Sequence, residues 1–148
     1  MPEAPISDPD WTARFEALGR ELGEREAEHG AALEHARDCA DRLREQVALA
    51  LERFHAAATG AGAPHLRAEL SPVRLDDKHL RAVEFNLVRG RHKAVVVAKS
   101  RGDVTLVGPF HVGKNEGPCK SFPMASEAEL QSALADFVVL FLEEAASP

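Results

Sequence analysis

The stretch Lys93-Ala94-Val95-Val96-Val97-Ala98-Lys99 is the most apolar strand-like segment of this 148-residue chain. Its valines are β-branched, which favours strands. The segments before and after it, Arg89-Gly90-Arg91-His92 and Ser100-Arg101-Gly102-Asp103, have the composition of short turns. A strand that is apolar on both faces is usually buried, so this segment predicts the central strand of a sheet.

Three further segments, 66–70, 83–88 and 104–107, alternate apolar and polar residues with a period of two. Pro72 ends the first of them, which predicts an edge strand. The connections are short, so we expect these segments and the central strand to pair in sequence order as a four-stranded antiparallel β-meander. Residues 108–123 contain three glycines and three prolines and predict a long loop.

A C-terminal helix is predicted from apolar residues that share one helical face, namely Leu130, Leu134, Phe137 and Phe141. Ser126 with Glu129 three residues later has the pattern of a capping box at its start. The apolar face is wide enough to cover one side of a four-stranded sheet. The expected fold class is therefore α+β, with a body over residues 65–146 that includes the 108–123 loop.

Residues 10–59 have helical periodicity and form a predicted helical arm, preceded by a flexible lead-in at residues 1–9, which contain three prolines. The second half of the arm carries a heptad-like seam, and the residues expected to hold a homodimer together lie on it: Leu33, Leu43, Val47 and Phe54. An earlier apolar group joins this seam only across polar positions 26 and 29; its members are Trp11, Phe15, Leu18 and Leu22. Two arrangements stay open: one long coiled-coil-like helix, or a helix pair that turns near Gly30.

Charge is segregated along the chain, whose formal net charge is -6. Residues 1–63 carry 7 Lys or Arg against 13 Asp or Glu, residues 64–123 carry 11 against 6, and residues 124–148 carry none against 5. Acidic helices that lie over a basic sheet would explain this pattern. The other explanation is a basic surface for an acidic partner, which we place on Arg91, Lys93, Arg101, Lys114 and Lys120.

Composition disfavours several classes of function. An aromatic content of 5% and a net negative charge are unlike those of a dedicated nucleic-acid-binding protein. The longest nearly apolar run, residues 137–142, is far shorter than the roughly 20 residues that cross a membrane. The N-terminus lacks the basic and apolar regions of a secretory signal, so we expect a cytoplasmic protein that does not enter a membrane.

The sequence contains patterns that resemble known motifs, but none of them predicts a catalytic or metal site. Gly108–Lys114 has the spacing of a phosphate-binding loop, but Asn115 replaces the hydroxyl residue that would bind magnesium, and no helix can follow. Cys119 with His111 nearby raises the question of thiol chemistry, although no carboxylate can be assigned to orient the histidine. The histidines are dispersed, so we expect no metal site and no cofactor.

We therefore expect a non-catalytic protein-interaction or oligomerisation module, adaptor-like or chaperone-like. In this interpretation the helical arm mediates self-association, and the basic sheet and loop surface binds an unidentified acidic protein. The alternative is a small-ligand or anion-binding domain with its site between the sheet and the 108–123 loop.

Overall fold

The computed structural model describes residues 9–76, 81–113 and 117–147. The chain forms two compact units, Met1–Ala31 and Ala32–Pro148. Helix α1 (Pro9–Gly60) is one uninterrupted helix of 52 residues. Gly30 continues the helix and has no positive φ, so the helix-pair alternative is wrong. Residues 1–8 of the predicted lead-in lie outside the described part of the chain.

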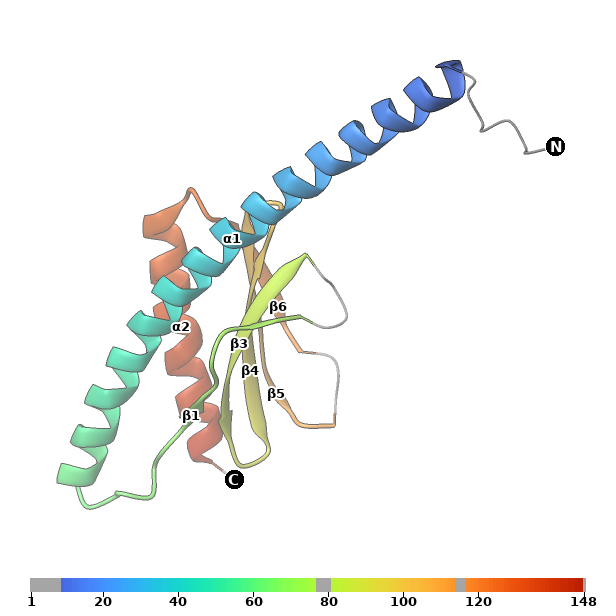
Figure 1. Cartoon of the computed structure of the whole chain (residues 1–148). Coiled ribbons are helices and arrows are strands. Elements are labelled where there is room, and N and C mark those ends of the chain that lie inside the picture. The colour runs from blue at the N-terminus through green and yellow to red at the C-terminus, as the bar shows by residue number, and fades with distance from the viewer. Residues whose placement is uncertain (1–8, 77–80, 114–116, 148) are drawn as a thin grey trace. The chain divides into compact units, whose positions relative to one another are not determined.

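The second unit contains one antiparallel sheet, with the strand order β1-β3-β4-β5-β6 (Figure 1). The meander consists of β3 (Ala82–Arg89), β4 (His92–Lys99), β5 (Asp103–His111) and β6 (Cys119–Pro123). Two short strands, β1 (Glu69–Leu70) and β2 (Arg74–Leu75), both pair with the outer side of β3. The prediction that residues 93–99 form the central strand is confirmed.

The prediction that residues 108–123 form a loop is wrong over much of its length, because 108–111 extend β5 and 119–123 form β6. A β-bulge accommodates the Gly-Pro pair: the β4–β5 register shifts between Lys93 and Val95, and pairing resumes at Phe110. Gly108 has a φ of 111°, and a Cβ atom there would lie 3.0 Å from the carbonyl oxygen of Lys93. Glycine and proline therefore belong to this strand because they form its bulge.

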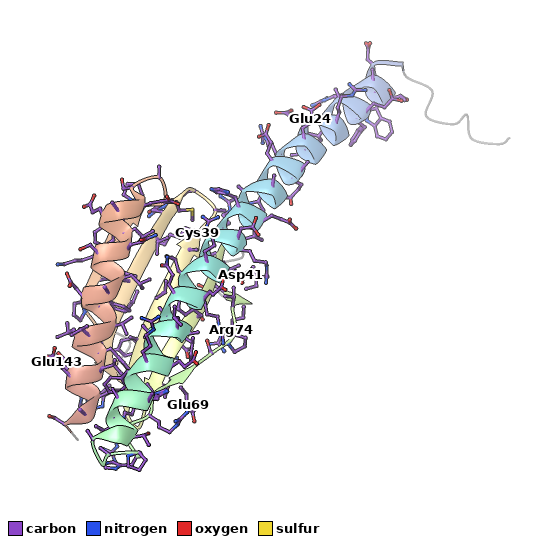
Figure 2. All side chains as sticks on the ribbon, turned by 90° about the vertical axis from the view of Figure 1, so that its left-hand side faces the viewer. Glu24, Cys39, Asp41, Glu69, Arg74 and Glu143 are labelled. Atoms are coloured by element: carbon purple, nitrogen blue, oxygen red, sulfur yellow. The ribbon has the colours of Figure 1, made fainter. Side chains whose placement is uncertain are left out.

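A helical layer covers one face of the sheet. Helix α2 (Glu127–Ala146) and residues 32–60 of α1 lie side by side on that face (Figures 1 and 2). The largest fully buried side chains come from the two helices and from β3, β4 and β5: Phe85, Phe141, Leu87, Val47, Val83, Val96 and Val104. The predicted C-terminal helix is confirmed, but the Ser126 side chain makes no capping hydrogen bond.

Three side-chain hydrogen bonds attach the segment between α1 and β3, and the end of α2, to the rest of this unit. Arg44 Nε donates to the carbonyl oxygen of Ser71 at 2.7 Å. The backbone N–H of Ala68 donates to His55 Nε2 at 3.1 Å. Arg89 Nη1 donates to the carbonyl oxygen of Ala145 at 3.1 Å, which places a cation at the C-terminal end of α2.

Candidate interaction surfaces

The Met1–Ala31 unit carries an exposed apolar stripe, which consists of Trp11, Phe15, Leu18 and Leu22. Their exposed fractions are 45%, 54%, 46% and 47%. At about 100° of rotation per residue, these four positions fall within an arc of about 60° on the helix. The rings of Trp11 and Phe15 are in contact, with centroids 4.7 Å apart. Four large apolar side chains on one helical face, each about half exposed, are typical of a surface that another protein covers.

The residues predicted to hold a dimer together have a different location. Leu43 and Val47 are buried inside the second unit, with exposed fractions of 5% and 2%. Leu33 is partly buried and packs against the same core. Phe54 is half-buried and lines a groove beside α2. The buried part of the heptad-like seam therefore packs within a single chain, and Leu43 is not available to a second copy while the core is intact.

An open groove of about 550 Å³ lies between the two helices of the second unit. It is mainly apolar, and it is lined by Gln46, Val47, Ala50, Arg53, Phe54, Gln131, Leu134, Ala135, Val138, Val139 and Leu142. Val139 is 53% exposed, although it belongs to an apolar run of α2. Sequence reasoning missed this groove because it depends on where the small residues Ala50 and Ala135 lie across two helices. The one sequence feature that could have indicated the groove is the apolar run at 137–142. In a helix these six residues point in all directions, so they cannot all face one sheet.

The predicted basic surface is dispersed. Arg91 lies in the turn before β4, and Arg101 lies in the turn after it, so about 23 Å of strand separates them at roughly 3.3 Å per residue. Lys93 lies near the first of these turns, and Lys120 lies on β6. Lys114 lies outside the described residues. The structure therefore does not bring the described members of this set together on one surface.

One end of the sheet does gather positive charge. A hollow of about 570 Å³ is lined by Arg81, Lys99 and Arg101, together with Asp76. The Arg101 guanidinium forms an ion pair with Asp103 at 2.9 Å, and the hydrogen bond with that carboxylate raises the pKa of Arg101. Much of the charge of Arg101 is therefore balanced locally. Sequence reasoning did not select Arg81, because its segment carried no recognisable motif.

A smaller hollow of about 330 Å³ lies between the β5–β6 side of the sheet and α2. Most of its lining is apolar, and the full set is Leu106, Gly108, Pro118, Cys119, Lys120, Phe122, Ala133, Asp136, Phe137 and Leu140. Lys120 and Asp136 contribute opposite charges. This hollow is the structural counterpart of the small-ligand alternative, and its composition favours an apolar ligand over an anion.

The two cysteines differ in their surroundings. Cys39 is 3% exposed, and burial raises the pKa of its thiol despite the neighbouring Arg42. Cys119 is exposed and pairs with Val107 across β5 and β6. His111 lies four positions beyond Val107 on β5, on the order of 10 Å along the strand. Its ring contacts His92, with centroids 4.6 Å apart. The two residues suggested for thiol chemistry are therefore not adjacent.

Within residues 9–76, 81–113 and 117–147, no group of three or more His, Cys, Asp or Glu side chains could hold a metal ion. No helix in the described part of the chain is both long and apolar enough to cross a membrane. A scan against protein-family models finds no match for this chain, and neither the curated proteins nor the solved structures yield one.

Proposed function

We propose that this protein is a non-catalytic interaction module that self-associates through the stripe formed by Trp11, Phe15, Leu18 and Leu22. The observation that carries this function is the exposure of all four side chains on one helical face. Aromatic and aliphatic anchors at i, i+4, i+7 and i+11 are the pattern with which an amphipathic helix binds an apolar surface. Self-association requires no further component, so it is the simplest way to cover this stripe.

The expected contact is modest in strength. Complete burial of one Phe or Leu side chain contributes about 1.5–3 kcal/mol. Each stripe residue is already about half buried, so docking recovers roughly half of that value per side chain. Association also costs about 4–15 kcal/mol of lost freedom. A contact limited to two stripes is therefore weak, and its population should depend on protein concentration.

The test is sedimentation velocity over a wide concentration range. The wild type should show a mass that rises with concentration, and Leu18→Asp should remain monomeric because the carboxylate would have to be desolvated in the contact. Ala13→Asp is the matched control, because position 13 lies about 200° from Trp11 on the same helix. A wild type that stays monomeric throughout, or an Ala13→Asp variant that dissociates as Leu18→Asp does, would contradict the proposal.

The second part of the proposed function is recognition of an acidic partner, and it needs a new site because the described residues of the predicted basic surface do not lie together. The best remaining site for such a partner is the hollow lined by the three cations Arg81, Lys99 and Arg101. Charge reversal at Arg81 and Lys99 should then weaken binding of an acidic peptide such as poly-glutamate, measured by fluorescence anisotropy at low salt. Unchanged binding in that variant would exclude this site.

The second candidate function is small-ligand binding in the hollow beside β6, favoured by its largely apolar lining. A ligand that binds the native state raises the melting temperature in proportion to its occupancy. Decanoate should therefore stabilise the wild type, and Ala133→Trp, which fills the hollow, should remove that shift. Inorganic phosphate is the comparison, and stabilisation by phosphate alone would point away from this hollow.

A further inference from the structure

We infer that the groove between α1 and α2 is the binding site for the apolar stripe of a second copy of this chain. Such a contact presupposes the self-association proposed above and specifies which surface the stripe meets. The groove belongs to the Ala32–Pro148 unit, and the stripe belongs to the Met1–Ala31 unit. The contact would be heterologous, because the two surfaces that meet are different.

The shape and composition of the groove fit a helix with large anchors. Ala50 and Ala135 contribute small side chains to its lining, and they leave an open volume of about 550 Å³. Phe54, Val139 and Leu142 add apolar surface. An amphipathic helix binds such a groove by inserting side chains from successive turns, which is the spacing that the stripe provides.

Helix α2 itself indicates that the groove is covered by another molecule. The segment from Phe137 to Leu142 consists of six apolar residues, and a helix of that length winds through more than one full turn. Phe137, Val138 and Phe141 are buried in the core, whereas Val139 is 53% exposed, and both valines contribute to the groove. A helix packed on a sheet and otherwise solvated normally has polar residues at such outward positions. The groove therefore has the properties of an interface.

Charge supports a stripe-bearing helix as the occupant. Arg53 is the one charged residue among those that line the groove in the described part of the chain, and the polar residues beside it are neutral glutamines. Residues 10–28 carry six Asp or Glu against three Arg. A groove whose lining is positive and free of carboxylates thus meets a helix that is negative. This complementarity favours the stripe of this chain over a basic amphipathic helix.

The test uses full-length variants that damage one surface each. Ala135→Arg places a bulky charge in the groove, and Ala50→Arg does the same from α1; both positions are exposed, so the fold should persist. Glu129→Arg is the control, because Glu129 is also exposed on α2, does not line the groove and lies about 120° from Ala135 around the helix. We expect Ala135→Arg and Ala50→Arg to weaken self-association by about tenfold or more, and Glu129→Arg to leave it unchanged. Far-UV circular dichroism and the melting temperature check that each variant is folded.

Mixing provides the decisive measurement. Trp11 is the only tryptophan of the chain and lies on the stripe, so its fluorescence reports whether the stripe is covered. A Trp11→Phe, Leu18→Asp double variant has a damaged stripe, no tryptophan and an intact groove. Added to Ala135→Arg, it should shift the Trp11 emission to the blue and form a mixed complex, although neither variant associates alone. If more Ala135→Arg is added in place of the double variant, the Trp11 emission should not shift.

The outcomes separate this inference from the proposed function. A wild type that stays monomeric refutes both. If the wild type associates, Leu18→Asp abolishes association and Ala135→Arg has no effect, then stripe pairs with stripe, and only the groove contact is refuted. If Ala135→Arg and Ala50→Arg are folded and monomeric but mixing restores nothing, the groove binds something other than the stripe, and the inference is again overturned.

Discussion

Truncation of the seam residues Leu43 and Val47 should destabilise the fold rather than dissociate an oligomer. Both side chains lie in the core that α1 shares with the sheet and α2, with exposed fractions of 5% and 2%. A coiled-coil dimer built on this seam would show the opposite behaviour, because the same truncations would separate two chains whose bodies remain folded. These two substitutions therefore distinguish the seam as a core from the seam as an interface.

The size of the effect follows from burial. Leu43→Ala removes three buried carbon atoms and should cost about 3 kcal/mol, within the range of about 2–5 kcal/mol for such core truncations. Val47→Ala removes two methyl groups, and at about 0.8 kcal/mol each plus a cavity contribution it should cost about 2 kcal/mol. With a urea dependence of about 2 kcal/mol per molar, the first change lowers the unfolding midpoint by about 1.5 M and the second by about 1 M.

The assay is urea denaturation followed by far-UV circular dichroism, with sedimentation velocity on the same samples. Leu49→Ala is the control, because Leu49 is 52% exposed on the same helix and its truncation should change stability by no more than about 0.5 kcal/mol. Below the unfolding transition, the Leu43→Ala variant should have the same mass as the wild type, because Leu43 does not line the groove. If Leu43→Ala had a lower mass than the wild type and an unchanged midpoint, the assignment of the seam to the core would be refuted.

Three further changes test contacts that position the layers. Arg89→Met should lower the free energy of unfolding by about 2 kcal/mol in urea titrations, because a charged hydrogen bond to the end of α2 is lost. The control Arg91→Met, at an exposed position, should leave the free energy of unfolding unchanged. Burial lowers the pKa of His55 below 6.5, so the unfolded chain binds the proton more readily and stability should fall as the pH drops below about 6.5. His55→Gln keeps an acceptor for the Ala68 N–H but cannot bind the proton, so its stability should not show this loss at low pH. If the variant lost stability with falling pH as the wild type does, His55 would not be the group responsible. Gly108→Ala should cost about 2 kcal/mol or more, because the residue has a positive φ and a Cβ atom would crowd β4; a variant as stable as the wild type would show that the bulge relaxes.

The sequence predicted the order of the main elements because its hydrophobic periods are clear. The run at 93–99 is apolar on both faces, and it forms the central strand β4. The strand β6 was missed because its five residues, Cys119–Pro123, are mostly exposed and show no strong alternation. An edge strand is held by backbone pairing with its one neighbour, here β5, and composition does not report that pairing. The same limit applies to the two-residue strands β1 and β2.

The surfaces were harder to predict than the fold. The basic residues of one segment suggested a binding surface, although the predicted meander already places successive turns at opposite ends of the sheet, and the structure separates Arg91 from Arg101 in that way. The groove involves residues about 85 positions apart, such as Ala50 and Ala135, and no local pattern links them. Side-chain periodicity identifies the buried face of a helix well. It does not reveal where two helices leave space between them.

The heptad-like pattern of α1 shows why one sequence signal can have two structural meanings. A row of apolar residues at spacings of three and four can be buried equally well against a second helix or against the face of a sheet. What separates the two cases in this chain is the interruption at Glu26 and His29, which precedes the unit boundary after Ala31. C-terminal to the interruption, seam residues are buried, as at Leu43 and Val47. N-terminal to it, Trp11 and the other stripe residues are half exposed. The interruption therefore marks a change in what the helix packs against, and the exposed half of the pattern carries the stripe that we propose a second molecule covers.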